Sequence, residues 1–60
     1  MNIHSLIITE IKKTRIVTSS EIAKKFKISL NTAEKYLLEL VIDGKVQKIK
    51  KVGVNLWVLK

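Results

Sequence analysis

The first part of the chain carries apolar side chains at helical spacing. The apolar stripe consists of Ile3, Leu6, Ile7 and Ile11. Steps of three and four residues predict an amphipathic helix over residues 2–13. Ile8 lies outside this stripe, so it either widens the core face of the helix or belongs to a contact with a second copy of the chain.

Two further helices are predicted over residues 19–27 and 30–43. The expected buried positions of the first are Ile22, Ala23 and Phe26, and those of the second are Ala33, Leu37, Leu40 and Val41. Only a short turn around Ile28 separates the two helices, which predicts the steep crossing of a helix-turn-helix. Leu38 and Ile42 lie outside the stripe of the longer helix, where they either pack under the following segment or contact another subunit.

Capping residues mark the ends of these helices. Asn2 is a candidate N-cap for the first helix. Thr18, followed three residues later by Glu21, has the pattern of a capping box, which predicts a helix start at residue 19. Ser29 is expected to cap the longest helix, and Gly44 is expected to follow its end in a left-handed conformation.

The period of the apolar residues changes after residue 45. Residues 46–59 read as two strands around a turn that contains Gly53, which predicts a β-hairpin. The short β-branched segment 15–17 is expected to pair with an edge of the resulting sheet. Trp57 is expected to fill the core or cover a sheet edge rather than to stack on bases. The predicted fold is therefore α+β, with the order helix, short strand, helix, helix, strand, strand in one domain of residues 1–60.

Composition excludes several kinds of site. The chain has no cysteine and one histidine, so it offers no disulfide and no thiolate metal site. We expect His4 to be solvated on the polar face of the first helix. The acidic residues stand at capping or solvated helical positions, and we expect neither an enzyme nor a cofactor nor a small-molecule ligand. No apolar run approaches the roughly 18 residues that a membrane span needs, and the N-terminal residues do not resemble a secretory signal.

Positive charge is concentrated at the end of the chain. The formal net charge is +7, and residues 45–60 contribute +5 of it, because they hold five lysines and no acidic residue. A basic segment on a nearly balanced body indicates a polyanionic partner. The alternative interpretation is a lysine-rich surface that only increases solubility.

The order of these elements resembles a winged helix-turn-helix domain. The resemblance extends from Asn2 to Leu59 and rests on the segments VTSSEIAKKFKIS, ISLNTAEKYLLEL and DGKV with the hairpin that follows. The pattern is similar to the DNA-binding core of MarR-like and DeoR-like regulators. It implies a small stand-alone regulator from an archaeon, a bacterium, a virus or a plasmid. In that family a residue matching Thr32, and basic residues just after it, contact DNA.

The predicted function is therefore binding of double-stranded DNA by a cytoplasmic, nucleoid-associated transcriptional regulator. The third helix would enter the major groove, backbone N–H groups at residues 19 and 20 would hold a phosphate, and the basic hairpin would follow the adjacent backbone or minor groove. The candidate DNA-binding residues are Ser19, Ser20, Ser29, Asn31, Thr32, Lys35, Tyr36, Lys48, Lys50 and Lys51. Asn31 is the candidate for a base contact, to adenine.

Glu34 departs from the family pattern, since many such regulators have Arg at this position. An acid repels phosphate, although it can accept a hydrogen bond from a cytosine amino group. Three alternative functions stay open: a sequence-tolerant chromatin-type protein, an rRNA-binding protein of the same fold, and a protein-interaction module. The working surface of the interaction module would consist of Leu38, Ile42, Val52 and Val54.

One recognition helix reads too few base pairs for useful selectivity, so a homodimer is predicted. Its expected interface lies on the first helix and consists of Ile3, Ile7, Ile8 and Ile11.

Overall fold

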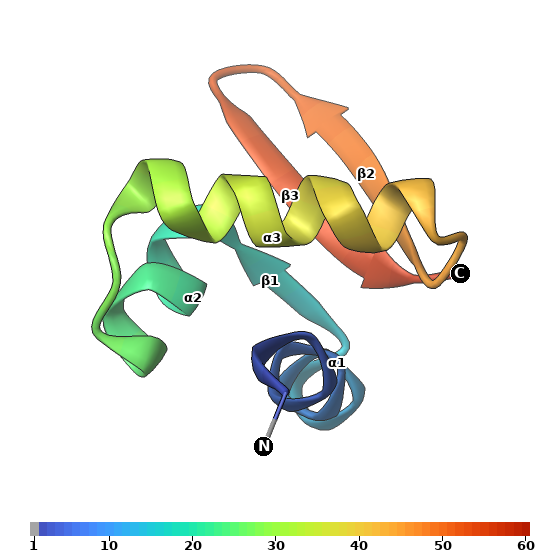
Figure 1. Ribbon diagram of the computed structural model, residues 1–60. Helices are drawn as coiled ribbons and strands as arrows, with labels where there is room; N and C mark the ends of the chain where they lie inside the picture. The colour runs from blue at the N-terminus through green and yellow to red at the C-terminus, as the bar shows by residue number, and fades with distance from the viewer. Residues whose placement is uncertain (1) are drawn as a thin grey trace.

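The computed structural model describes residues 2–60. These residues form three helices and a three-stranded antiparallel sheet (Figure 1). The elements are α1 (Ile3–Thr14), β1 (Ile16–Thr18), α2 (Ser19–Phe26), α3 (Leu30–Ile42), β2 (Val46–Lys51) and β3 (Val54–Leu59). The predicted α+β class and the winged-helix-like order of elements are confirmed. No helix end differs from the predicted one by more than one residue. We call the β-hairpin of β2 and β3 the wing.

The predicted caps form as expected. The Asn2 side chain accepts a hydrogen bond from the His4 backbone N–H. Thr18 and Glu21 form the capping box at the start of α2, with N···O distances of 3.2 and 2.8 Å. The Ser29 hydroxyl oxygen accepts from the Thr32 backbone N–H at 3.1 Å and so caps α3. These local contacts satisfy backbone donors that a helix start leaves free.

The chain reverses direction at residues with positive φ. Lys27 ends α2 in a left-handed conformation with φ 55°, and its backbone N–H donates to the Ala23 carbonyl. Gly44 follows α3 with φ 77°, and Gly53 forms the hairpin turn with φ 79°, as predicted for both glycines. Lys27 therefore sets the short connection that places α2 against α3.

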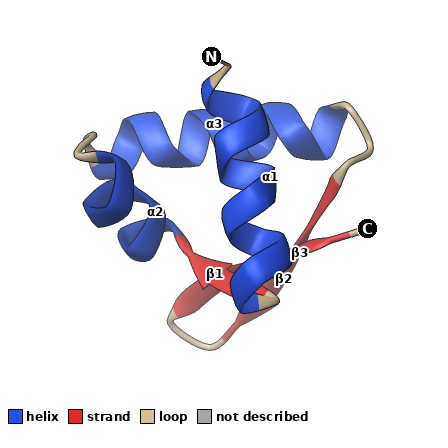
Figure 2. Ribbon diagram, turned by 90° about the horizontal axis from the view of Figure 1, so that it is seen from below, coloured by secondary structure: helices blue, strands red, loops and turns tan. Residues whose placement is uncertain are grey.

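The sheet has the strand order β1-β3-β2, so β3 lies in the middle. Trp57 of β3 stands opposite Val17 of β1 on one side and opposite Lys48 of β2 on the other. The predicted pairing of the short segment with a sheet edge is confirmed, with the strand running from residue 16 to residue 18. The helices gather on one side of the sheet (Figure 2). The buried sheet residues Val17, Val46 and Trp57 belong to the same core as the buried residues of the helices.

One core joins the helices to the sheet. Its buried members are Ile7, Ile11, Val17, Ile22, Ala33, Leu37, Leu40, Val46 and Trp57. The predicted stripes of α2 and α3 are therefore largely correct, although three of their predicted members, Ala23, Phe26 and Val41, are only partly buried at the margin. Leu38 and Ile42 have 44% and 83% of their surface exposed to solvent. The alternative that they pack under the hairpin is therefore wrong.

Helix α1 gives its apolar stripe to this core. Ile7 and Ile11 are fully buried within the single chain, while Ile3 and Ile8 are partly buried and pack against the core. Fully buried side chains offer no surface to a second copy. The predicted dimer interface is therefore corrected: Ile7 and Ile11 stabilise the monomer, and Ile3 and Ile8 are the members of that set with free surface.

His4 connects α1 to α3 and is not simply solvated, contrary to the expectation. Its Nε2 atom lies 2.7 Å from the Glu39 carboxylate, and its Nδ1 atom lies 3.0 Å from the Asn2 side-chain oxygen. The imidazole also meets the Tyr36 ring edge-on, with centroids 5.2 Å apart.

Within residues 2–60, no helix is long and apolar enough to cross a membrane.

Candidate nucleic-acid interface

One stripe of α3 faces solvent. It consists of Asn31, Lys35, Leu38 and Ile42, all of them exposed. Leu30, at the start of α3, is exposed outside this stripe. Residues spaced by three and four lie on the same side of a helix, and the buried residues of α3 lie on the opposite side. The polar half of the stripe is the N-terminal half, which leaves an amide and an ammonium group free to contact a ligand along α3.

The remaining predicted residues of α3 have local contacts. Ser29 caps the helix, and its hydroxyl group lies 2.8 Å from the Thr32 hydroxyl group. Thr32 is partly buried. Tyr36 packs against the core and against the His4 ring, on the α1 side of the helix. The Tyr36 ring therefore helps to hold α1 against α3, and its contact with DNA stays a prediction.

The wing lysines divide between the two faces of the hairpin. Successive side chains of a strand point to opposite faces. Lys48 stands opposite the buried Trp57, and its ammonium nitrogen lies 5.7 Å from the centroid of the indole ring, a cation–π contact. Lys50 shares this face, whereas Lys51 projects from the other one. Lys48 and Lys50 therefore stand beside α3, and Lys51 extends the basic surface away from it.

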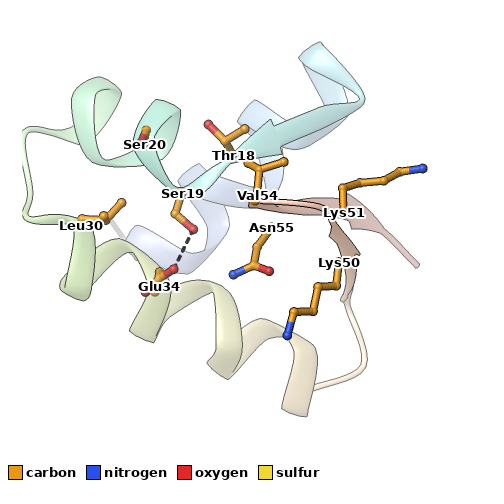
Figure 3. A pocket seen from close by; sticks show the side chains of 10 residues that line it. Thr18, Ser19, Ser20, Leu30, Glu34, Lys50, Lys51, Val54 and Asn55 are labelled. Atoms are coloured by element: carbon orange, nitrogen blue, oxygen red, sulfur yellow. Dashed lines mark hydrogen bonds between the residues drawn. The ribbon is translucent and has the colours of Figure 1, made fainter.

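A groove separates α3 from the wing, and we call it the wing groove. Its volume is about 370 Å³. It is lined by Thr18, Ser19, Ser20, Leu30, Glu34, Lys50, Lys51, Gly53, Val54 and Asn55. Figure 3 shows Lys50 reaching toward α3 and the Asn55 amide pointing into the space between the wing and α3. The predicted residues Ser20, Lys50 and Lys51 thus meet at one groove.

The side chain of Ser19 has a structural role that the sequence did not predict. It is the buried polar residue of the described chain, with 6% of its surface exposed. Its hydroxyl oxygen accepts a hydrogen bond from the Trp57 indole N–H at 3.0 Å, and the hydroxyl group donates to the Glu34 carboxylate at 3.5 Å. Its side chain is therefore occupied by contacts inside the protein. The use of backbone N–H groups at residues 19 and 20 stays a prediction.

The sequence interpretation did not connect Trp57 to the site, and it did not predict the contact of Glu34 with Ser19. A buried indole N–H needs an acceptor, which was a signal that Trp57 would have a polar neighbour. The departure of Glu34 from the family pattern was a signal that this position has its own role. Neither signal identified Ser19, which lies 38 residues before Trp57, as the connecting residue.

The cations of the interface are not neutralised by ion pairs within residues 2–60. The pairs there join His4 to Glu39 and Lys25 to Glu10. Lys35, Lys50 and Lys51 belong to neither pair, so their ammonium groups are available to an external anion. No group of three or more His, Asp or Glu side chains within the same residues could hold a metal ion.

Comparisons with models of protein families and with curated proteins found no match to this chain. The chemistry of the candidate interface therefore rests on its own residues. It offers an amide and several ammonium groups for phosphates and base edges, together with one carboxylate in the wing groove.

Proposed function

We propose that the protein is a transcriptional regulator that binds double-stranded DNA. The observation that carries this proposal is the exposed polar half of α3, with Asn31 and Lys35, beside a wing that bears three exposed lysines. Side chains of these types contact phosphates and base edges in protein–DNA complexes. The net charge of +7 adds general attraction to a polyanion. The protein would act in the cytoplasm, on the nucleoid.

The exposed stripe of α3 supports insertion of this helix into the major groove. B-DNA has a major groove about 12 Å wide, which admits one α-helix. In this arrangement Asn31 makes two hydrogen bonds to an adenine, and Lys35 contacts a nearby phosphate. Lys48 and Lys50 contact the backbone beside α3, and Lys51 reaches the next part of the backbone or the minor groove.

Selection of bound fragments from a random DNA pool, carried out at two salt concentrations, tests this function. We expect an enriched motif with an adenine at one position, and we expect Asn31→Ala to lose the preference there at a cost of about 1–3 kcal/mol. Binding without any enriched motif would support a sequence-tolerant chromatin-type protein instead. Absence of binding at both salt concentrations would contradict both.

We further propose that the protein binds DNA as a homodimer, because one inserted helix contacts too few base pairs for selectivity. With Ile7 and Ile11 buried, the surface that α1 can contribute is limited to residues such as Ile3 and Ile8. Analytical ultracentrifugation at micromolar concentration should show dimers, and the selected motif should be palindromic. Monomers alone, with a single half-site as the motif, would contradict the homodimer.

A protein-interaction module is the second candidate, favoured by the exposed apolar residues. Ile42 and Val52 have 83% and 104% of their surface exposed, and Leu38 and Val54 have 44% and 43%. Leu38 and Ile42 are one turn apart on α3, and Val52 and Val54 flank Gly53 at the hairpin turn. Exposed apolar side chains of this kind can mark contact surfaces. Weak binding of nucleic acid at low salt, unchanged when the wing lysines are replaced by Ala, would favour this candidate over DNA binding.

A further inference from the structure

The wing groove has a carboxylate on one wall and a cation on the other. Glu34, on α3, contributes the carboxylate, and Lys50, on the wing, extends its ammonium group toward α3 (Figure 3). Lys51 also lines the groove, but its ammonium group points away from α3. Within residues 2–60 Glu34 belongs to neither of the ion pairs. Its negative charge therefore remains available in a surface that otherwise attracts phosphate.

A chain of hydrogen bonds leads from the core to this carboxylate. Trp57 is buried and donates its indole N–H to the Ser19 hydroxyl oxygen. Because the indole can only donate, the proton of the Ser19 hydroxyl is free to point elsewhere. It points to the Glu34 carboxylate. A buried residue of the sheet and the first residue of α2 thus orient an acceptor on α3.

The partly buried setting of Glu34 limits the directions in which its carboxylate can accept a hydrogen bond. The side chain is only partly exposed, and it lies near the N-terminus of α2, where the helix dipole favours a negative charge. One carboxylate oxygen takes the hydrogen bond from Ser19, which leaves the other free to accept from a ligand. Glu34 thus presents a fixed acceptor toward the wing groove.

Two kinds of DNA group respond in opposite ways to this acceptor. A phosphate is repelled by it. An exocyclic amino group of a base can donate to it, and among the base edges of the major groove cytosine offers the N4 amino group without an adjacent acceptor. Adenine presents N7 beside its amino group, and two acceptors facing each other are unfavourable. The chemistry of the groove therefore favours cytosine over adenine.

We propose that Glu34 is a specificity-determining residue, which accepts a hydrogen bond from a cytosine amino group and keeps phosphate away from the α3 wall of the wing groove. Lys50 holds the phosphate on the opposite wall. This inference rests on the proposed DNA-binding function and adds the base that one part of the interface selects.

The test compares Glu34→Gln with Glu39→Gln in the random-pool selection and in salt titrations with a non-specific duplex. Both changes remove one negative charge from α3, but Glu39 lies on the α1 side, against His4. We expect wild type and Glu39→Gln to select cytosine at one position. Glu34→Gln should lose this cytosine in favour of adenine, because Gln pairs with the adenine edge. It should also bind the non-specific duplex with a salt slope steeper by up to about 0.9, the effect of one more phosphate contact.

Ser19→Ala provides a second variant, because it keeps the charge of Glu34 but removes the hydrogen bond that orients it. We expect a weaker preference for cytosine and an unchanged salt slope, with far-UV circular dichroism showing that all three variants are folded. The same motif and slope for Glu34→Gln and Glu39→Gln would overturn the role of Glu34 and leave DNA binding intact. Absence of any motif for wild type would overturn the proposed function, and the role of Glu34 with it.

Discussion

Trp57→Ala is expected to unfold the protein at room temperature. Trp57 is the largest fully buried side chain, with 1% of its surface exposed, and it lies in the central strand. Replacing a buried Trp by Ala costs about 3–5 kcal/mol, since the substitution leaves a cavity. A 60-residue domain has a free energy of unfolding of roughly 3–9 kcal/mol. This single change therefore removes most or all of the stability.

Urea denaturation followed by far-UV circular dichroism measures this effect, because Trp fluorescence is lost with the side chain. Ile42→Ala is the matched control, since it also truncates a large apolar residue but at a position that is 83% exposed. It should change the free energy of unfolding by less than about 0.5 kcal/mol. Trp57→Phe should fall between the two, because it keeps an aromatic ring but removes the donor to Ser19. A Trp57→Ala protein with the wild-type urea midpoint would show that the core does not depend on this side chain.

The elements of the fold could be predicted because local interactions determine them. The capping box at Thr18 and Glu21 needs contacts only three residues apart, and the same holds for Ser29 and Thr32. The change from helical to alternating spacing after residue 45 located the hairpin. Such short-range signals mark where each helix and strand begins, and the structure follows them closely.

Contacts between distant residues could not be predicted in the same way. His4 is on the polar side of α1 by spacing alone, yet its partner Glu39 lies 35 residues further along the chain. The Tyr36 ring is directed to α1 because α1 crosses that side of α3, and the sequence does not contain this crossing explicitly. Both residues belong to the packing of the helices rather than to the exposed stripe.

Composition alone does not show which lysines lie on which face of the wing, because this depends on the strand register. Shifting the strand register by one residue would exchange the faces on which its side chains lie. The observed pairing of Lys48 with Trp57 and of Lys50 with Asn55 places these two lysines beside α3. The sequence predicted a basic wing, but only the register divides its lysines between the two faces. This division makes the contribution of the wing testable separately from that of net charge.

Replacing Lys48, Lys50 and Lys51 together by Ala is expected to lower the affinity for duplex DNA by on the order of 100-fold at about 0.15 M salt, because each phosphate contact contributes a salt slope of about 0.9. The three side chains are exposed and belong to neither ion pair within residues 2–60. Their loss removes the cation–π contact of Lys48 with the Trp57 ring but no buried apolar side chain, so the core should keep its packing. Fluorescence anisotropy with a labelled duplex at several salt concentrations measures both quantities. The slope should fall by about 2.7 if each lysine neutralises one phosphate.

The matched control replaces Lys12, Lys13 and Lys24, which are exposed on α1 and α2. In Figure 1 α1 lies on the other side of α3 from the hairpin turn. Both triple variants lower the formal net charge from +7 to +4, so a general attraction would weaken equally in both. Contacts by the wing predict instead that the control keeps nearly the wild-type slope, since distant charges are screened by salt. Equal losses in the two variants would assign the affinity to net charge and would remove the wing from the interface.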